Sequence, residues 1–67
     1  MKYSFVIPCY NSSKTIGKVV DEINNKMLAM KEDNYEIILV NDSSKDNTRD
    51  VIFNLANNSH ITAISLA

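Results

Sequence analysis

The sequence holds one cysteine, one glycine and one proline among its 67 residues. A single cysteine excludes a disulfide scaffold and a cysteine-rich zinc site, and a single glycine excludes the common glycine-rich phosphate loops. No apolar run approaches the roughly 18 residues of a membrane span, and the N-terminus does not resemble a signal peptide. Seven basic and eight acidic residues give a net charge of −1, which argues against a module that binds nucleic acid by neutralising phosphates.

What is present is an ordinary globular balance, with 45% hydrophobic and 22% charged residues, and a length that allows at most one domain. Apolar runs predict strands at residues 3–8, 35–40 and 61–66, and apolar residues at three- and four-residue steps predict helices at about 14–30 and 47–57. The order β-α-β-α-β predicts an α/β fold with a parallel sheet and right-handed crossovers.

Side-chain caps and packing follow from the same pattern. We expect Ser12 or Ser13 to cap the first helix and Asp46 to cap the second, because short polar side chains accept bonds from free helical N–H groups. Met27 and Met30 continue the apolar stripe of the first helix, so we expect both to pack on the sheet.

Two crossovers of the same hand predict the spatial strand order 3-2-1, which is half of a doubly wound, Rossmann-like fold, with both helices on one face of the sheet. The other face and the outer edge of the first strand then lack a cover. We therefore interpret residues 1–67 as the N-terminal part of a larger domain, and expect the separate chain to self-associate or to pack against the rest of that domain.

Ligands of open parallel sheets bind beyond the carboxyl ends of the strands. Two segments reach that edge, residues 8–11 and residues 41–44, and together they offer an aromatic ring, a carboxylate and short polar groups. An aromatic face suits stacking on a nucleobase, and a carboxylate can accept an N–H from a base edge. The sequence thus predicts a nucleotide site without a glycine-rich loop.

At these segments the chain resembles family-2 glycosyltransferases. Residues 6–11, Val-Ile-Pro-Cys-Tyr-Asn, resemble the family's Val-Ile-Pro-x-Tyr-Asn opening, and residues 40–48 resemble its Val-Asp-Asp-Gly-Ser-x-Asp-x-Thr segment. The resemblance implies a GT-A nucleotide-diphospho-sugar transferase fold of the kind used in cell-wall or polysaccharide biosynthesis. Residues 35–40 and 61–67 look most like the branch that loads sugars onto polyprenyl-phosphate lipids.

The resemblance also implies roles. The donor would be a sugar nucleotide, usually a UDP-sugar, the acceptor a lipid phosphate or a saccharide, and the location cytoplasmic, with the full-length protein at the cytoplasmic face of a membrane. Mg²⁺ or Mn²⁺ would serve the full-length protein, but this chain would hold neither the metal ligands nor a catalytic residue. The implied nucleotide-binding residues are Pro8, Cys9, Tyr10, Asn11, Asp42 and Ser44.

Two departures from the family pattern bear on the site. Asn41 replaces the first acid, which predicts one negative charge fewer beside the nucleotide, and Ser43 replaces a glycine, which predicts a loop without positive φ. The alternative hypothesis is a non-catalytic nucleotide-binding or interaction module with the same frame. A phosphoacceptor receiver domain shares the topology but needs acids where this chain has Pro8 and Cys9. We expect Cys9 to be a buried, unreactive thiol and His60 to be a surface or strand-start residue.

Overall fold

The computed structural model describes residues 2–43 and 45–66. Its elements are β1 (Tyr3–Cys9), α1 (Ile16–Ala29), β2 (Tyr35–Asp42), α2 (Thr48–Leu55) and β3 (Ile61–Leu66). The expected β-α-β-α-β order is confirmed, and each expected element has a counterpart. No helix of this part of the chain is long and apolar enough to cross a membrane.

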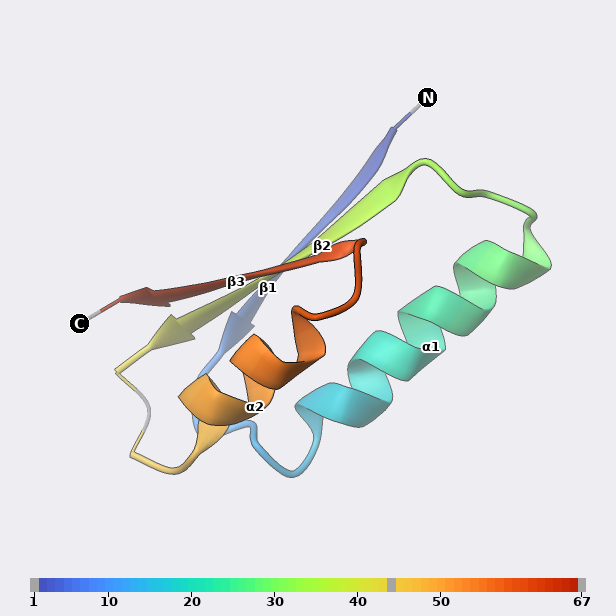
Figure 1. Ribbon diagram of the computed structural model, residues 1–67. Coiled ribbons are helices and arrows are strands. Elements are labelled where there is room, and N and C mark those ends of the chain that lie inside the picture. Colours follow the sequence, from blue (N-terminus) through green and yellow to red (C-terminus); the bar gives the residue numbers. More distant parts are fainter. Residues whose placement is uncertain (1, 44, 67) are drawn as a thin grey trace.

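The three strands form one parallel sheet in the order β1-β2-β3, which confirms the expected spatial order. Tyr3 lies opposite Tyr35 at one end of the first pair, and Cys9 lies opposite Asn41 at the other. Figure 1 shows both helices on the same side of the sheet, as two right-handed crossovers in one direction require.

The core lies between the helices and one face of the sheet. Ile37 and Leu39 of β2 have no exposed surface, and they pack in one cluster with residues from every other element: Cys9, Ile16, Val20, Ile52 and Ile61. Because successive side chains of a strand alternate between faces, these β2 residues point toward the helices and Ile38 and Val40 point away from them.

The other face of the sheet carries no helix in the described residues, as Figure 1 shows. Large apolar side chains are exposed there: Val6 at 64%, Ile64 at 42% and Leu66 at 50%. Strands of parallel sheets are normally buried on both faces, so this side is unusually apolar for a free surface.

The helices are shorter than expected. The expectation that Ser12 or Ser13 caps α1 with its side chain is wrong. The N-cap residue of α1 is Thr15, without a side-chain cap bond, and the backbone oxygen of Ser12 accepts the N–H of Ile16 at 2.9 Å instead. Met27 is buried, but Met30 lies just past the helix and is half exposed, so only Met27 packs as expected.

Candidate functional site

The loop between β1 and α1 and the loop between β2 and α2 meet at the carboxyl edge of the sheet, below the ends of β1 and β2 in Figure 1. Hydrogen bonds join them. The backbone N–H of Lys45 donates to Oδ1 of Asn11 at 2.9 Å, and the backbone N–H of Ser12 donates to Oγ1 of Thr48 at 2.8 Å. The two loops expected to form the site are therefore held to one another by direct contacts.

Asp46 is the centre of a third connection. Its Oδ2 accepts the hydroxyl of Ser13 at 2.9 Å and its Oδ1 accepts the backbone N–H of Thr48 at 3.0 Å. The hydroxyl of Thr48 also donates to Oδ1. Chiefly because the Thr48 hydroxyl donates to the charged form, the pKa of Asp46 falls to about 2. Asn47 is the N-cap residue of α2 and makes no side-chain cap bond, so the expected N-cap role of Asp46 is wrong. The carboxylate of Asp46 still accepts the N–H of Thr48, from the residue before the N-cap.

Tyr10 and Asp42 are the two exposed groups suited to a nucleobase. Tyr10 is 59% exposed and directly follows Cys9, while Asp42 is exposed and directly follows Asn41. Cys9 and Asn41 are register partners with buried side chains. Tyr10 follows the last residue of β1, and Asp42 is the last residue of β2. The fold thus brings Tyr10 and Asp42 to the same carboxyl edge, at the ends of two neighbouring strands.

Pro8 and Cys9 are part of β1 rather than of a loop. The side chain of Cys9 is only 1% exposed and its thiol donates to the carbonyl of Ile7 at 3.4 Å. Burial raises the pKa of the thiol, against a smaller opposing effect of a backbone hydrogen bond with Val40. Cys9 is accordingly a buried, unreactive thiol, as expected, and only its backbone lies near the edge of the sheet.

Asn41 lies in β2, not in a loop, and its side chain is 4% exposed on the helix-covered face. Its Nδ2 donates to Oγ of Ser65 at 3.2 Å, and its Oδ1 has no hydrogen-bond partner in the described residues. We expected Asn41 to lie beside the nucleotide, where the family's first acid would add a negative charge. That placement is wrong, because the side chain of Asn41 faces the core.

Ser43 replaces the glycine of the family pattern, and the expectation that its loop lacks a positive φ is wrong. Its φ is 55°, so the loop keeps the left-handed conformation that glycine adopts without strain, now with a serine. Asn11, in the facing loop, also has a positive φ of 50°. Ser44, an expected nucleotide-binding residue, lies outside the described residues.

The resemblance to family-2 glycosyltransferases implies a divalent metal ion for the full-length protein. Across residues 2–43 and 45–66, no three His, Cys, Asp or Glu side chains gather closely enough to hold one. The described residues therefore do not form a site for that ion.

Sequence reasoning missed the bonds that fix the two loops, made by Asn11, Ser13 and Thr48. An Asp two residues before a Thr at a helix start is a known local signal for such a turn, but the contacts of Asp46 to Ser13 cross 33 residues and leave no local trace. His60 precedes β3 as expected, and its ring stacks on that of Tyr35 with centroids 4.0 Å apart.

Comparisons with known proteins bear on this arrangement. The family model described as glycosyl transferase family 2 matches residues 4–66. The chain is 40% identical over 57 residues to dolichyl-phosphate beta-glucosyltransferase ALG5A of Trichomonas vaginalis, covering 79% of this chain and 18% of that protein. It is 38% identical over 63 residues to poly-beta-1,6-N-acetyl-D-glucosamine synthase of Staphylococcus aureus, covering 94% of this chain and 14% of that protein.

A solved structure agrees with these relatives. The crystal structure of S. aureus TarS 1-349 superimposes with a TM-score of 0.75 at 27% identity, covering 98% of this chain and 19% of that one. The chain thus spans less than a fifth of the length of each of these proteins. The family match extends from the second residue of β1 to the end of β3 and so spans both site loops. This chain therefore belongs to glycosyl transferase family 2.

Proposed function

We propose that this chain binds the nucleotide of a sugar-nucleotide donor, a UDP-sugar, as the nucleotide-binding part of a larger glycosyltransferase domain. The larger protein would transfer the sugar to a lipid-phosphate or saccharide acceptor. The observation that carries the proposal is that an exposed Tyr10 and an exposed Asp42 directly follow the register partners Cys9 and Asn41 at the carboxyl edge, in a member of a sugar-transferring family.

Each residue has a distinct task in this proposal. The ring of Tyr10 stacks on the base, an interaction that contributes about 1–3 kcal/mol. The carboxylate of Asp42 accepts an N–H from the base edge, and a hydrogen bond to a charged group contributes about 1.5–3 kcal/mol. Pro8, Cys9 and Asn11 shape the backbone around the base. Uracil offers a ring N–H between two carbonyls, so an acceptor at Asp42 favours it over cytosine, whose corresponding nitrogen is itself an acceptor.

The test is a titration of the ¹⁵N-labelled chain with uridine and UDP, with cytidine as the competing base. We expect weak binding of uridine and UDP, with shift changes at Tyr10 and Asp42. Tyr10→Ala and Asp42→Asn should each weaken binding by about tenfold, equivalent to about 1.4 kcal/mol. Asp21→Asn, at an exposed aspartate of α1, is the matched control and should change nothing.

Two results would contradict the proposal. One is a shift pattern centred away from the carboxyl edge. The other is an equal loss of affinity in Asp42→Asn and Asp21→Asn at matched stability. Submicromolar affinity for UDP would contradict the further point that most diphosphate contacts lie outside these residues.

A non-catalytic binding module is the second candidate. The observation in its favour is that no Asp-x-Asp metal motif occurs in the 67 residues. We expect a nucleotide-release assay on this chain to stay at background with several sugar nucleotides. Turnover that survives repurification and disappears in Asp42→Ala would place catalytic groups within the chain. It would refute the second candidate, and also our proposal that the catalytic groups lie in the rest of the larger domain.

The same function implies a place in the cell, the cytoplasmic face of a membrane. A relative named for a dolichyl-phosphate acceptor supports a cytoplasmic protein whose longer form works at the cytoplasmic face of a membrane. The acceptor class and the location are tested together, by asking whether the longer protein sediments with membranes that contain a polyprenyl phosphate.

A further inference from the structure

The loop that carries Tyr10 is anchored to the start of α2 through one buried hydroxyl. The backbone N–H of Ser12 donates to Oγ1 of Thr48 at 2.8 Å, and Thr48 has no exposed surface. A threonine hydroxyl has one proton, which Thr48 donates to Oδ1 of Asp46, so its lone pairs are what accept from Ser12. The bonds therefore run in one direction, from the loop N–H through Thr48 to the carboxylate of Asp46.

The next residue of the loop makes a second connection to the same carboxylate. The backbone N–H of Ser13 donates to Oδ2 of Asp46 at 3.4 Å, and the hydroxyl of Ser13 donates to the same oxygen at 2.9 Å. These bonds are exposed, so water can replace them at little cost. Loss of the buried Thr48 hydroxyl would instead leave the N–H of Ser12 without its acceptor. Thr48 is therefore the stronger of the two constraints on the loop.

The place of Tyr10 depends on this anchor. Tyr10 is more than half exposed, so packing contributes little to where its ring lies. The hydroxyl of Ser12 donates to the carbonyl of Tyr10 at 3.1 Å, and Asn11 between them turns the chain with a φ of 50°. The backbone that follows Tyr10 is thus fixed by Ser12, and Ser12 is fixed by Thr48.

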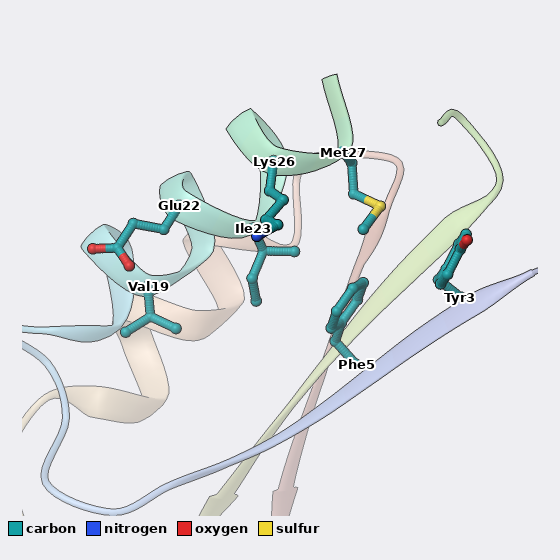
Figure 2. A pocket seen from close by; sticks show the side chains of 7 residues that line it. All are labelled: Tyr3, Phe5, Val19, Glu22, Ile23, Lys26 and Met27. Carbon is teal, nitrogen blue, oxygen red and sulfur yellow. The ribbon is translucent and has the colours of Figure 1, made fainter. Parts of the chain in front are cut away.

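The groove between β1 and α1 lies at the other end of the strand. It is apolar, with a volume of about 420 Å³, and Figure 2 shows Phe5 on its β1 side and Ile23 and Met27 on its α1 side. The constraint on Tyr10 therefore comes from the start of α2, through bonds between described residues, and not from the part of α1 that lines the groove.

We propose that Thr48 is a positioning residue of the nucleotide site, which holds Tyr10 at the carboxyl edge that it shares with Asp42, ready to stack on a uracil base. The inference rests on the function proposed above. It adds a residue that contacts no ligand itself, because Thr48 is fully buried. One hydroxyl then joins the loop of Tyr10 to the helix that follows the loop of Asp42.

Two substitutions isolate the hydroxyl. Thr48→Val keeps the shape of the side chain without the hydroxyl, and Thr48→Ser keeps the hydroxyl. We expect Thr48→Val to raise the Kd for uridine and UDP by roughly three- to tenfold, at most the effect of Tyr10→Ala, and Thr48→Ser to bind like the parent chain. Titrations run where circular dichroism shows each variant to be folded. Thr62→Val, at an exposed threonine of β3, is the matched control and should leave the Kd unchanged.

A double-mutant cycle shows whether Thr48 acts through Tyr10. In a Tyr10→Ala background, Thr48→Val should cause no further loss of affinity, because the effects of residues that act through one another do not add. A merely structural role would lower the free energy of unfolding in both backgrounds and leave the Kd of the folded chain unchanged. Additive losses, or an unchanged Kd in Thr48→Val, would overturn the proposal.

A measurement without ligand separates this inference from the proposed function. Backbone ¹⁵N relaxation should show more motion at residues 10–12 in Thr48→Val and not in Thr48→Ser. Unchanged order at these residues would overturn the inference whether or not UDP binds. More motion in a chain whose parent binds neither uridine nor UDP would refute the proposed function and still support the placement of Tyr10 by Thr48. If Thr48→Val fails to fold, Thr48→Ala and Thr48→Ser repeat the comparison, since they differ only in the hydroxyl.

Discussion

Asp46 receives donors from both site loops, and its low pKa makes the connection sensitive to acid. The folded-state pKa is about 2, below the roughly 3.9 of an unperturbed aspartate. The stabilisation is therefore present above about pH 4 and is lost as the pH falls through about 2. We expect Asp46→Asn to lower the melting temperature at pH 7, because an amide cannot accept from Ser13 and Thr48 as a carboxylate does.

The pH dependence distinguishes this effect from a general loss of stability. The difference in melting temperature between the parent chain and Asp46→Asn should shrink between pH 4 and pH 2, measured by circular dichroism. Asp21→Asn, at an exposed position of α1, is the control and should show no such trend. A difference that stays constant from pH 7 to pH 2 would mean that the carboxylate bonds do not contribute.

Ser43 carries backbone strain at an exposed position. A residue other than glycine in the left-handed region costs roughly 1–2 kcal/mol, and the φ of Ser43 is 55°. Glycine also gains freedom in the unfolded chain, which offsets part of the relief, so we expect Ser43→Gly to stabilise the fold by about 0.5–1 kcal/mol. Urea unfolding measures it, and Ser43→Ala, which keeps the strain, should give no such gain.

Asn41 shows what the sequence could and could not tell at this scale. The motif identified the position, but its assignment to a loop put the side chain beside the nucleotide. Ile37, Leu39 and Asn41 share one parity along β2 and one buried face, so a strand extended by two residues would have predicted a buried amide. Its partner Ser65 is 24 residues away, and no local pattern predicts that contact.

At the scale of elements, α1 ends in a Schellman motif that lacks its usual glycine. The N–H of Glu32 bonds the carbonyl of Met27 at 2.9 Å, that of Lys31 bonds Leu28 at 3.0 Å, and Lys31 has a φ of 55°. We expect Lys31→Gly to stabilise the fold by about 0.5–1 kcal/mol, because glycine is relaxed at this position.

The control for this prediction has the opposite sign. Lys26→Gly lies within α1, where glycine costs up to about 1 kcal/mol. Chemical denaturation of both variants should therefore separate them by about 1–2 kcal/mol. Two equal destabilisations would mean that the αL conformation of Lys31 is not a source of strain.

The elements themselves were largely predictable, and their ends were not. Consecutive β-branched and apolar residues specified β1 and β2, and three- and four-residue steps specified α1, because burial on a sheet selects both patterns. The serine caps failed since Ser12 stabilises α1 through its backbone carbonyl, a role open to any residue. Asp46, from outside α2, supplies the bond expected of a cap and joins a second loop as well.

At the scale of the whole molecule, the two faces of the sheet should respond differently to the same substitution. Leu39 of β2 has no exposed surface, and Leu66 of β3 is 50% exposed on the helix-free face. We expect Leu39→Ala to cost about 2–5 kcal/mol, a large part of the stability of a small domain, and Leu66→Ala to stay within about 0.5–1 kcal/mol. Thermal unfolding of the separate chain checks both values. Equal costs would show that the helix-free face is covered in solution.

The parallel sheet also has a consequence in time. Ser4 and Glu36, which bond across β1 and β2, are 32 residues apart, and the strand pair of β2 and β3 joins residues 24 apart. Both described strand pairs are parallel and cannot form as hairpins, so each must close a long loop before it gains contacts, and such closures slow folding. A newly made chain therefore exposes its apolar strand β2 until β1 or β3 pairs with it. During that interval a chaperone or another copy of the chain can bind the exposed strand.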